Sequence, residues 1–174
     1  MTHVMDREQT LEFLRQHVKT DMLMKHLFTV EAAMRGYARK AGEDEERWGI
    51  AGLLHDFDWE ICPTPEDHPN FGAQILRDHG YPEDMIRAVL THGDHTGIPR
   101  ESLMEHTLFA VDELSGFIRA VTLVRPNKSL SDTSVRSGRK MRDKAFAKSI
   151  NLRRHCPGRG GTGNRPRRAY RLCY

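Results

Sequence analysis

Three absences limit the class of protein that this sequence encodes. Only three of its 174 residues are cysteine, and two of them, Cys156 and Cys173, lie near the carboxyl end, which excludes a disulfide framework and a thiolate zinc site. No apolar run approaches the roughly 20 residues needed to cross a bilayer. The first residues, MTHVMDREQT, lack the apolar core of a signal peptide. We therefore predict a soluble, cytoplasmic globular domain that does not associate with a membrane.

Acidic residues are missing from the last part of the chain. All 24 of them precede residue 151, whereas residues 153–174 contain seven arginines. Without those arginines the chain has 20 basic and 24 acidic residues, a net charge of −4. The overall charge of +3 therefore reflects the tail, and the composition argues against a nucleic-acid partner for residues 1–150.

The sequence also lacks an internal repeat and any alternating strand pattern longer than a few residues. Apolar spacing, with glycine and proline at the breaks, instead predicts helices near residues 11–18 and over 21–41, 43–55, 69–79, 82–92, 101–124 and 134–149. In the second of these, Leu23, Leu27, Val30 and Met34 share one face. The expected fold class is all-α, a helical bundle formed by residues 1–150.

The segment AGLLHDFDWE joins an apolar helical run directly to the pair His55 and Asp56. A buried carboxylate is costly unless something compensates its charge, and a metal ion beside histidine does so. The rest of the chain offers further nitrogen and oxygen ligands. The candidate metal ligands are His26, His55, Asp56, His68, His92 and Asp112.

The candidate ligands favour particular ions and a particular placement. All the histidines among them except His68 fall within or at the end of a predicted helix, and Ala51 and Gly52 before His55 are small enough to leave room for an ion between packed helices. Imidazole and carboxylate ligands suit a divalent transition metal: manganese, iron, zinc, cobalt or nickel. One or two ions are expected, and Asp56 would bridge a pair.

The ordered set His26, His55-Asp56, His92 and Asp112, with GLL before the pair, resembles the HD-domain metal-dependent phosphohydrolases over residues 20–125. The stretch DHPNFGAQIL around His68 looks like the family members with two metals. The stretch ELSGFIRAVTLVRPNKSLSD resembles a small uncharacterised branch of the family, and this second resemblance does not identify a substrate. The resemblance implies an all-α fold, a metal site between helices and hydrolysis of a phosphate ester.

The implied reaction assigns roles to several residues. A bound metal would lower the pKa of its water toward neutrality, and that water would attack the phosphorus of a small-molecule ester, with a nucleotide as one possible class. We expect Asp56 to act as ligand or bridge. His95 is the candidate for proton handling, although a supporting contact to a ligand, a substrate contact or a surface position all remain open. Lys25 and Arg125 are candidate phosphate contacts, as are Lys128 and Lys140; a solvated surface is the alternative.

The residues Asp58, Trp59 and Glu60, directly after the His-Asp pair, allow two interpretations. They either line the pocket mouth or belong to an ordinary loop anchored by a buried Trp59. Two further functions also suit the same six ligands: an HD-fold di-iron oxygenase, and a regulator that binds metal or nucleotide without turnover. The sequence does not indicate an oligomeric state.

Residues 151–174 form a basic tail rich in glycine and arginine, without apolar periodicity, and we predict that it is disordered. We interpret residues 152–174 as a frameshift product. Codons chosen for these residues, read after deletion of one base in the first, give REDIARAAEELGIDLGEHIAFV, which has early acids and helical apolar spacing. The alternative is a genuine basic tail, and the nucleotide sequence of the gene decides between the two.

Overall fold

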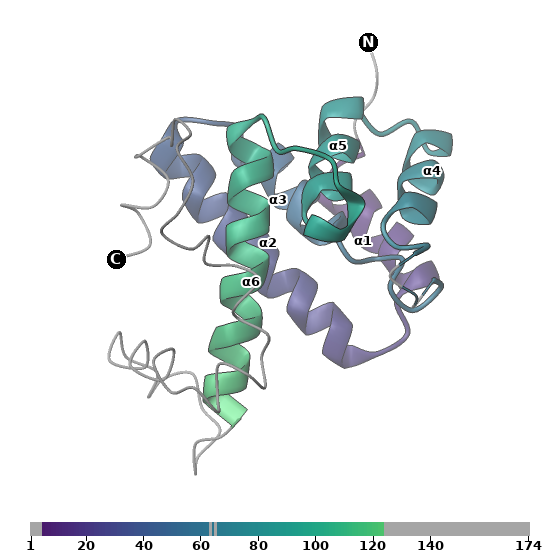
Figure 1. Ribbon diagram of the computed structural model, residues 1–174, viewed down its shortest axis with the longest axis horizontal. Coiled ribbons are helices and arrows are strands. Elements are labelled where there is room, and N and C mark those ends of the chain that lie inside the picture. Colours follow the sequence, from purple (N-terminus) through teal and green to yellow (C-terminus); the bar gives the residue numbers. More distant parts are fainter. Residues whose placement is uncertain (1–4, 63, 65, 124–174) are drawn as a thin grey trace. The chain divides into compact units, whose positions relative to one another are not determined.

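The computed structural model describes residues 5–62, 64 and 66–123, and within these ranges it is all-α, as predicted. The elements are α1 (Arg7–His17), α2 (Asp21–Ala41), α3 (Glu45–Leu54), α4 (Asn70–Asp78), α5 (Glu83–Thr91), the short 3-10 helix η1 (Asp94–Thr96) and α6 (Leu103–Leu123) (Figure 1). The chain divides into two compact units, Met1–Asp112 and Glu113–Tyr174, and every candidate ligand lies in the first. The helix predicted over 134–149 and the tail from 151 lie outside the described residues.

Local capping chemistry sets the helix ends. Helix α2 has its predicted bounds: the Thr20 side chain accepts a hydrogen bond from the Leu23 N–H at its start, and Gly42, with φ of 75°, ends it in the left-handed conformation. Helix α3 begins at Glu45, two residues later than predicted. The Asp44 carboxylate explains this shift, because it accepts from two backbone N–H groups of the first turn and so stands before the helix.

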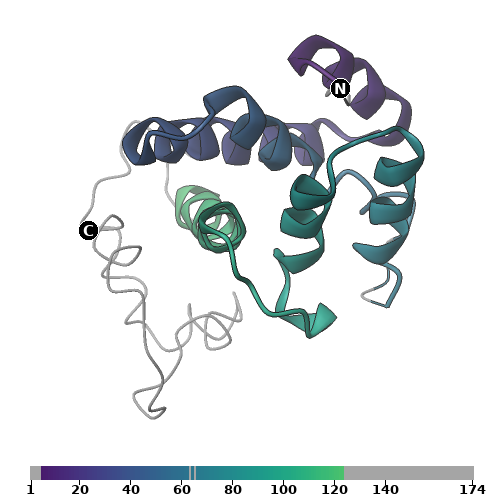
Figure 2. The same cartoon turned by 90° about the horizontal axis from the view of Figure 1, so that it is seen from above.

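Helix α3 is the centre of the hydrophobic core in the first unit. It packs against α1, α2 and α5, while α4 packs against α5 (Figure 2). The predicted apolar face of α2 is confirmed as buried, and Leu53 and Leu54 of α3 have no exposed surface. The pair His55 and Asp56 follows α3 directly, so the core fixes its position. Among the described residues, no helix combines the length and the apolarity needed to cross a membrane.

Gly52 allows α3 to pack closely against α2; it does not leave space for an ion. A Cβ atom built at this position would lie 3.0 Å from the backbone nitrogen of Glu31 and 3.1 Å from its Cα. The missing side chain therefore lets α3 approach α2 closely, which corrects the role expected for this glycine from the sequence.

The variant Gly52→Ala is expected to lower the free energy of unfolding by about 1–3 kcal/mol, because the added methyl group forces two packed backbones apart. Gly36 of α2 is the matched control, since a Cβ there meets nothing within 4 Å. Gly36→Ala should raise the stability by about 0.5–1 kcal/mol through the better helix propensity of alanine. Urea unfolding followed by circular dichroism measures both, and two shifts of the same sign would contradict the packing argument.

Candidate metal centre

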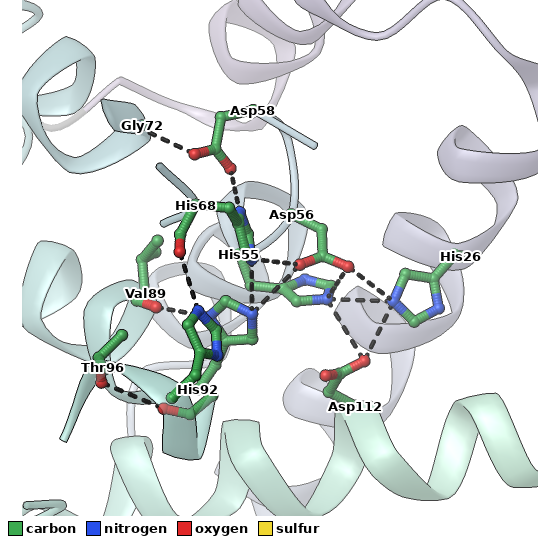
Figure 3. A network of polar contacts seen from close by, with 12 residues as sticks. His26, His55, Asp56, Asp58, His68, Gly72, Val89, His92, Thr96 and Asp112 are labelled. Carbon is green, nitrogen blue, oxygen red and sulfur yellow. Dashed lines mark hydrogen bonds and ion pairs between the residues drawn. The ribbon is translucent and has the colours of Figure 1, made fainter. Parts of the chain in front are cut away.

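The six candidate ligands converge from five parts of the first unit. His26 lies on α2, His55 and Asp56 follow α3, and Asp112 lies on α6. Of the remaining two, His68 precedes α4 with Pro69 between them, and His92 directly follows α5. Figure 3 shows their side chains pointing toward one another, in two groups that meet at Asp56.

The first group contains His26, His55, Asp56 and Asp112, whose ligand atoms all lie within 4.8 Å of one another. The His26 Nε2 is 3.1 Å from the His55 Nε2 and 3.1 Å from the Asp112 Oδ1. The Asp56 Oδ2 lies 3.6 Å from the His26 Nε2 and 3.4 Å from the His55 Nε2. Two imidazole nitrogens and two carboxylate oxygens therefore face one point, a donor set that suits a divalent transition metal.

The second group contains Asp56, His68 and His92. Both histidine Nε2 atoms approach the Asp56 Oδ1, at 3.3 Å for His68 and 3.2 Å for His92. Asp56 thus turns Oδ2 toward the first group and Oδ1 toward the second. One carboxylate divided in this way has the arrangement of a bridge between two ions.

Two of the candidate ligand histidines have their tautomer set by the helix that they end. The His55 Nδ1 lies 2.8 Å from the carbonyl of Gly52, and the His92 Nδ1 lies 2.5 Å from the carbonyl of Val89. A carbonyl oxygen can only accept, so each Nδ1 carries a proton and donates it. Each Nε2 is then left with a lone pair aimed into the centre, which is the form that binds a metal.

His68 reaches the same state through a carboxylate. Its Nδ1 lies 2.7 Å from the Asp58 Oδ1, which accepts a hydrogen bond from it. The Nε2 atoms of His68 and His92 are 3.2 Å apart and both face the Asp56 Oδ1. When neither Nε2 carries a proton, these three electron-rich atoms repel one another, and a cation among them would turn that repulsion into attraction.

The side chains of the centre differ in exposure. Those of His55, His68 and His92 are 0%, 2% and 5% exposed, whereas those of His26, Asp56 and Asp112 are 15%, 19% and 20% exposed. Three histidines are therefore buried, while His26 and the two carboxylates have some contact with solvent.

The histidines and carboxylates of the centre shift one another's pKa values. Burial opposes a proton on His68, but its hydrogen bonds to Asp56 and Asp58 outweigh burial and raise the pKa of His68 to about 9. Burial likewise opposes charge on His55, yet Asp56 and Asp112 raise its pKa well above the usual value. The pKa values of both carboxylates are lowered despite burial, because the histidines stabilise their ionised forms. Protons thus compete for the lone pairs that a metal would use.

Affinity for a divalent ion is therefore expected to rise with pH up to about pH 9. Below the pKa of His68 a metal must displace its proton, so each displaced proton costs about tenfold in affinity per pH unit. Calorimetric titration with Mn²⁺ between pH 6.5 and 8.5 measures this, and buffers of different ionisation enthalpy count the released protons. Affinity that stays constant or falls as the pH rises would contradict the expectation.

His95 lies beside the centre but belongs to neither group of ligand atoms. Its ring is exposed and stacks at a centroid distance of 6.0 Å from the ring of His68, and its Nε2 donates to the backbone carbonyl of the same residue at 2.8 Å. Its proposed role in proton handling stays a prediction. Lys25 is exposed on α2, and the other candidate phosphate contacts lie outside the described residues.

The residues after the His-Asp pair have three different roles. Asp58 is fully buried and accepts a hydrogen bond from His68, a role that the sequence signalled only by a second carboxylate close after the His-Asp pair. Trp59 is 44% exposed, with its ring edge against His68 at 5.2 Å, so the expectation of a buried anchor was wrong. Glu60 accepts from the backbone N–H groups of Lys19 at 2.5 Å and Thr20 at 3.2 Å, which ties this loop to the start of α2.

Comparison with known proteins agrees with this geometry. The family model described as HD domain matches residues 23–123. A curated relative, ribonuclease Y of Oleidesulfovibrio alaskensis, is 32% identical over 95 residues, which make up 54% of this chain and 18% of that protein. The chain thus matches less than a fifth of that relative's length. No solved structure matches. Because the family match covers more than half of the chain and contains all six converging residues, the chain belongs to the HD domain family of the metal-dependent hydrolase superfamily.

Proposed function

We propose that this chain is a metal-dependent phosphohydrolase that cleaves a phosphate ester, with nucleotides among the candidate substrates, by means of a metal-activated water. The observation that carries the proposal is the division of the Asp56 carboxylate between two groups of imidazole nitrogens. Two ions in such a site would clamp the attacking and leaving oxygens of an in-line displacement. Membership of the HD domain family supports the same reaction class.

In this proposal His26, His55 and Asp112 hold one ion, His68 and His92 hold a second, and Asp56 bridges them. The mixed nitrogen and oxygen donors favour manganese, iron, zinc, cobalt or nickel. When bound, such ions lower the pKa of water and polarise the phosphoryl oxygen.

The protein residues would orient the reactants and exclude water. In this proposal the ester would enter beside Asp56 and Asp112, because these carboxylates are partly exposed whereas His55 and His68 are buried. Trp59, partly exposed beside His68, offers an apolar surface to the organic part of the ester. If His95 transfers a proton through Nε2, its hydrogen bond to the carbonyl of His68 must first break.

The test combines metal analysis of the purified chain with a panel of phosphomonoesters, phosphodiesters and nucleotides. Hydrolysis that disappears with a chelator and returns with one of the five metals would support the proposal. Iron content with oxygen uptake, and no phosphate release, would favour the di-iron oxygenase instead. Tight nucleotide binding without turnover by the metal-loaded protein would point to a regulator.

A further inference from the structure

Asp58 is a charged side chain placed where charge is expensive. It has no exposed surface and directly follows Phe57, which is also fully buried. Moving a carboxylate out of water costs several kcal/mol unless hydrogen bonds replace the lost hydration. Within the described part of the chain, its ion-pair partner is His68, and the second hydrogen bond comes from the backbone of Gly72 at 3.0 Å.

His68 differs from the other ligand histidines in what holds it. His55 and His92 end helices, and each donates from Nδ1 to a carbonyl three residues earlier. His68 stands two residues before Asn70, the first residue of α4, and its Nδ1 donates instead to the carboxylate of Asp58, ten residues earlier in the chain. A charged acceptor forms a stronger hydrogen bond than a neutral carbonyl.

The second carboxylate oxygen of Asp58 caps the start of α4. This helix starts at Asn70 with Pro69 before it and has no side-chain cap of its own. The N–H of Gly72, in the first turn, therefore lacks an acceptor within the helix, and the Asp58 Oδ2 accepts from it as a remote cap. The carboxylate also lies at the positive end of the helix dipole, which favours its charge.

Gly72 makes this contact possible. A Cβ atom at this position would lie 2.7 Å from both the Cγ and the Oδ2 of Asp58, closer than nonbonded atoms allow. A glycine in a helix costs about 0.5–1 kcal/mol relative to alanine, and the close approach to the carboxylate accounts for its presence here.

We propose that Asp58 is a positioning residue: it holds His68 in the tautomer that presents Nε2 to the second ion, and it locks the start of α4 to that ligand. This inference rests on the proposed two-ion site. It adds that binding of the second ion depends on the Asp58 carboxylate, which is not itself a ligand. Gly72 contributes because it lets this carboxylate approach the start of α4.

The variant Asp58→Asn separates positioning from volume. An amide has one acceptor oxygen, so either the Nδ1–H of His68 or the N–H of Gly72 would face the donor side of the amide. We expect affinity at the second ion to fall by about 10- to 100-fold, with affinity at the first unchanged, in a calorimetric Mn²⁺ titration of the full chain. Asp67→Asn is the matched control, because Asp67 neighbours His68 in sequence but is exposed and accepts from Thr64.

A second readout does not depend on metal. Long-range ¹H–¹⁵N NMR of the metal-free chain at pH 10 reports which nitrogen of His68 carries the proton. The proposal expects the Nδ1–H form in the parent chain and a shift toward Nε2–H in Asp58→Asn. If the parent chain binds no second ion, the two-ion function fails, but the NMR result still decides the role of Asp58.

The variant Gly72→Ala provides an independent test if Asp58→Asn does not fold. It changes no polar group yet displaces the carboxylate, so it should weaken the second ion and shift the tautomer in the same direction. Circular dichroism checks the fold of each variant, and Gly36→Ala controls for a methyl group added to a helix. Wild-type affinity at the second ion together with an unchanged His68 tautomer in a folded variant would overturn the proposal, as would equal losses at both ions.

Discussion

Asp56→Ala is expected to remove both ions at once and to lower kcat/KM by at least about 10³-fold. The reason is that each oxygen of this carboxylate faces a different group of histidines, so one substitution deprives both ions of a ligand. A metal contributes several kcal/mol of charge stabilisation in the transition state, and about 4 kcal/mol corresponds to the stated loss. Metal content by mass spectrometry and hydrolysis of the best substrate measure the two effects.

Two further variants separate loss of the ions from loss of the fold. Asp56→Asn keeps the shape of the side chain but removes its charge, and it should also lose the ions. Asp78→Ala removes an exposed carboxylate from α4 and should retain both metal and turnover. Full hydrolysis by a folded Asp56→Ala protein would refute the metal mechanism.

Asp112→Asn and His92→Ala should each reduce the metal content from two ions to one, but at different groups. The candidate ligand atom of Asp112 belongs to the first group, and that of His92 belongs to the second. Each variant should lose about 10²–10³-fold in turnover, the cost of removing one preorganised stabilising group. Electron paramagnetic resonance of the Mn²⁺ proteins distinguishes a coupled pair of ions from a single one.

The exposed His79, whose Nδ1 lies against the carbonyl of Ile75, gives the control for this pair of variants. His79→Ala should keep both ions and the coupled spectrum. If Asp112→Asn and His92→Ala each lose both ions, the two groups form a single site, and the proposed assignment of ligands is wrong.

The sequence was informative where structure depends on neighbours along the chain. The bounds of α2 and its buried face followed from apolar spacing and from Gly42, since helical periodicity repeats every few residues. The order of His26, the His-Asp pair and Asp112 was recognised instead by its resemblance to the HD-domain pattern, because no local periodicity links residues so far apart. The structure brings their ligand atoms together, and it places His68 and His92 beside Asp56.

Partners that are distant along the chain escaped prediction. The carboxylate of Glu31 is buried because Arg7 lies 2.6 Å and Arg35 2.9 Å away, and one of these partners comes from α1. Asp58 is buried against residues ten and fourteen positions later. Patterns of neighbouring residues do not indicate contacts between distant parts of the chain. From the sequence, these buried carboxylates could therefore not be distinguished from exposed acidic residues.

The hydrogen bonds around the centre also determine whether conformational entropy is lost on folding or on metal binding. His55 and His92 are oriented by carbonyls of their own helices, and Glu60 fixes the loop after the His-Asp pair to the start of α2, the helix that carries His26. These contacts would restrain the side chains before an ion binds, so little conformational freedom would remain to be lost on binding. In a zinc finger the ion builds the fold, whereas this chain has an apolar core formed by buried residues of several helices around α3. An ion would therefore enter a preorganised site, and exchanging one metal for another should leave the architecture unchanged.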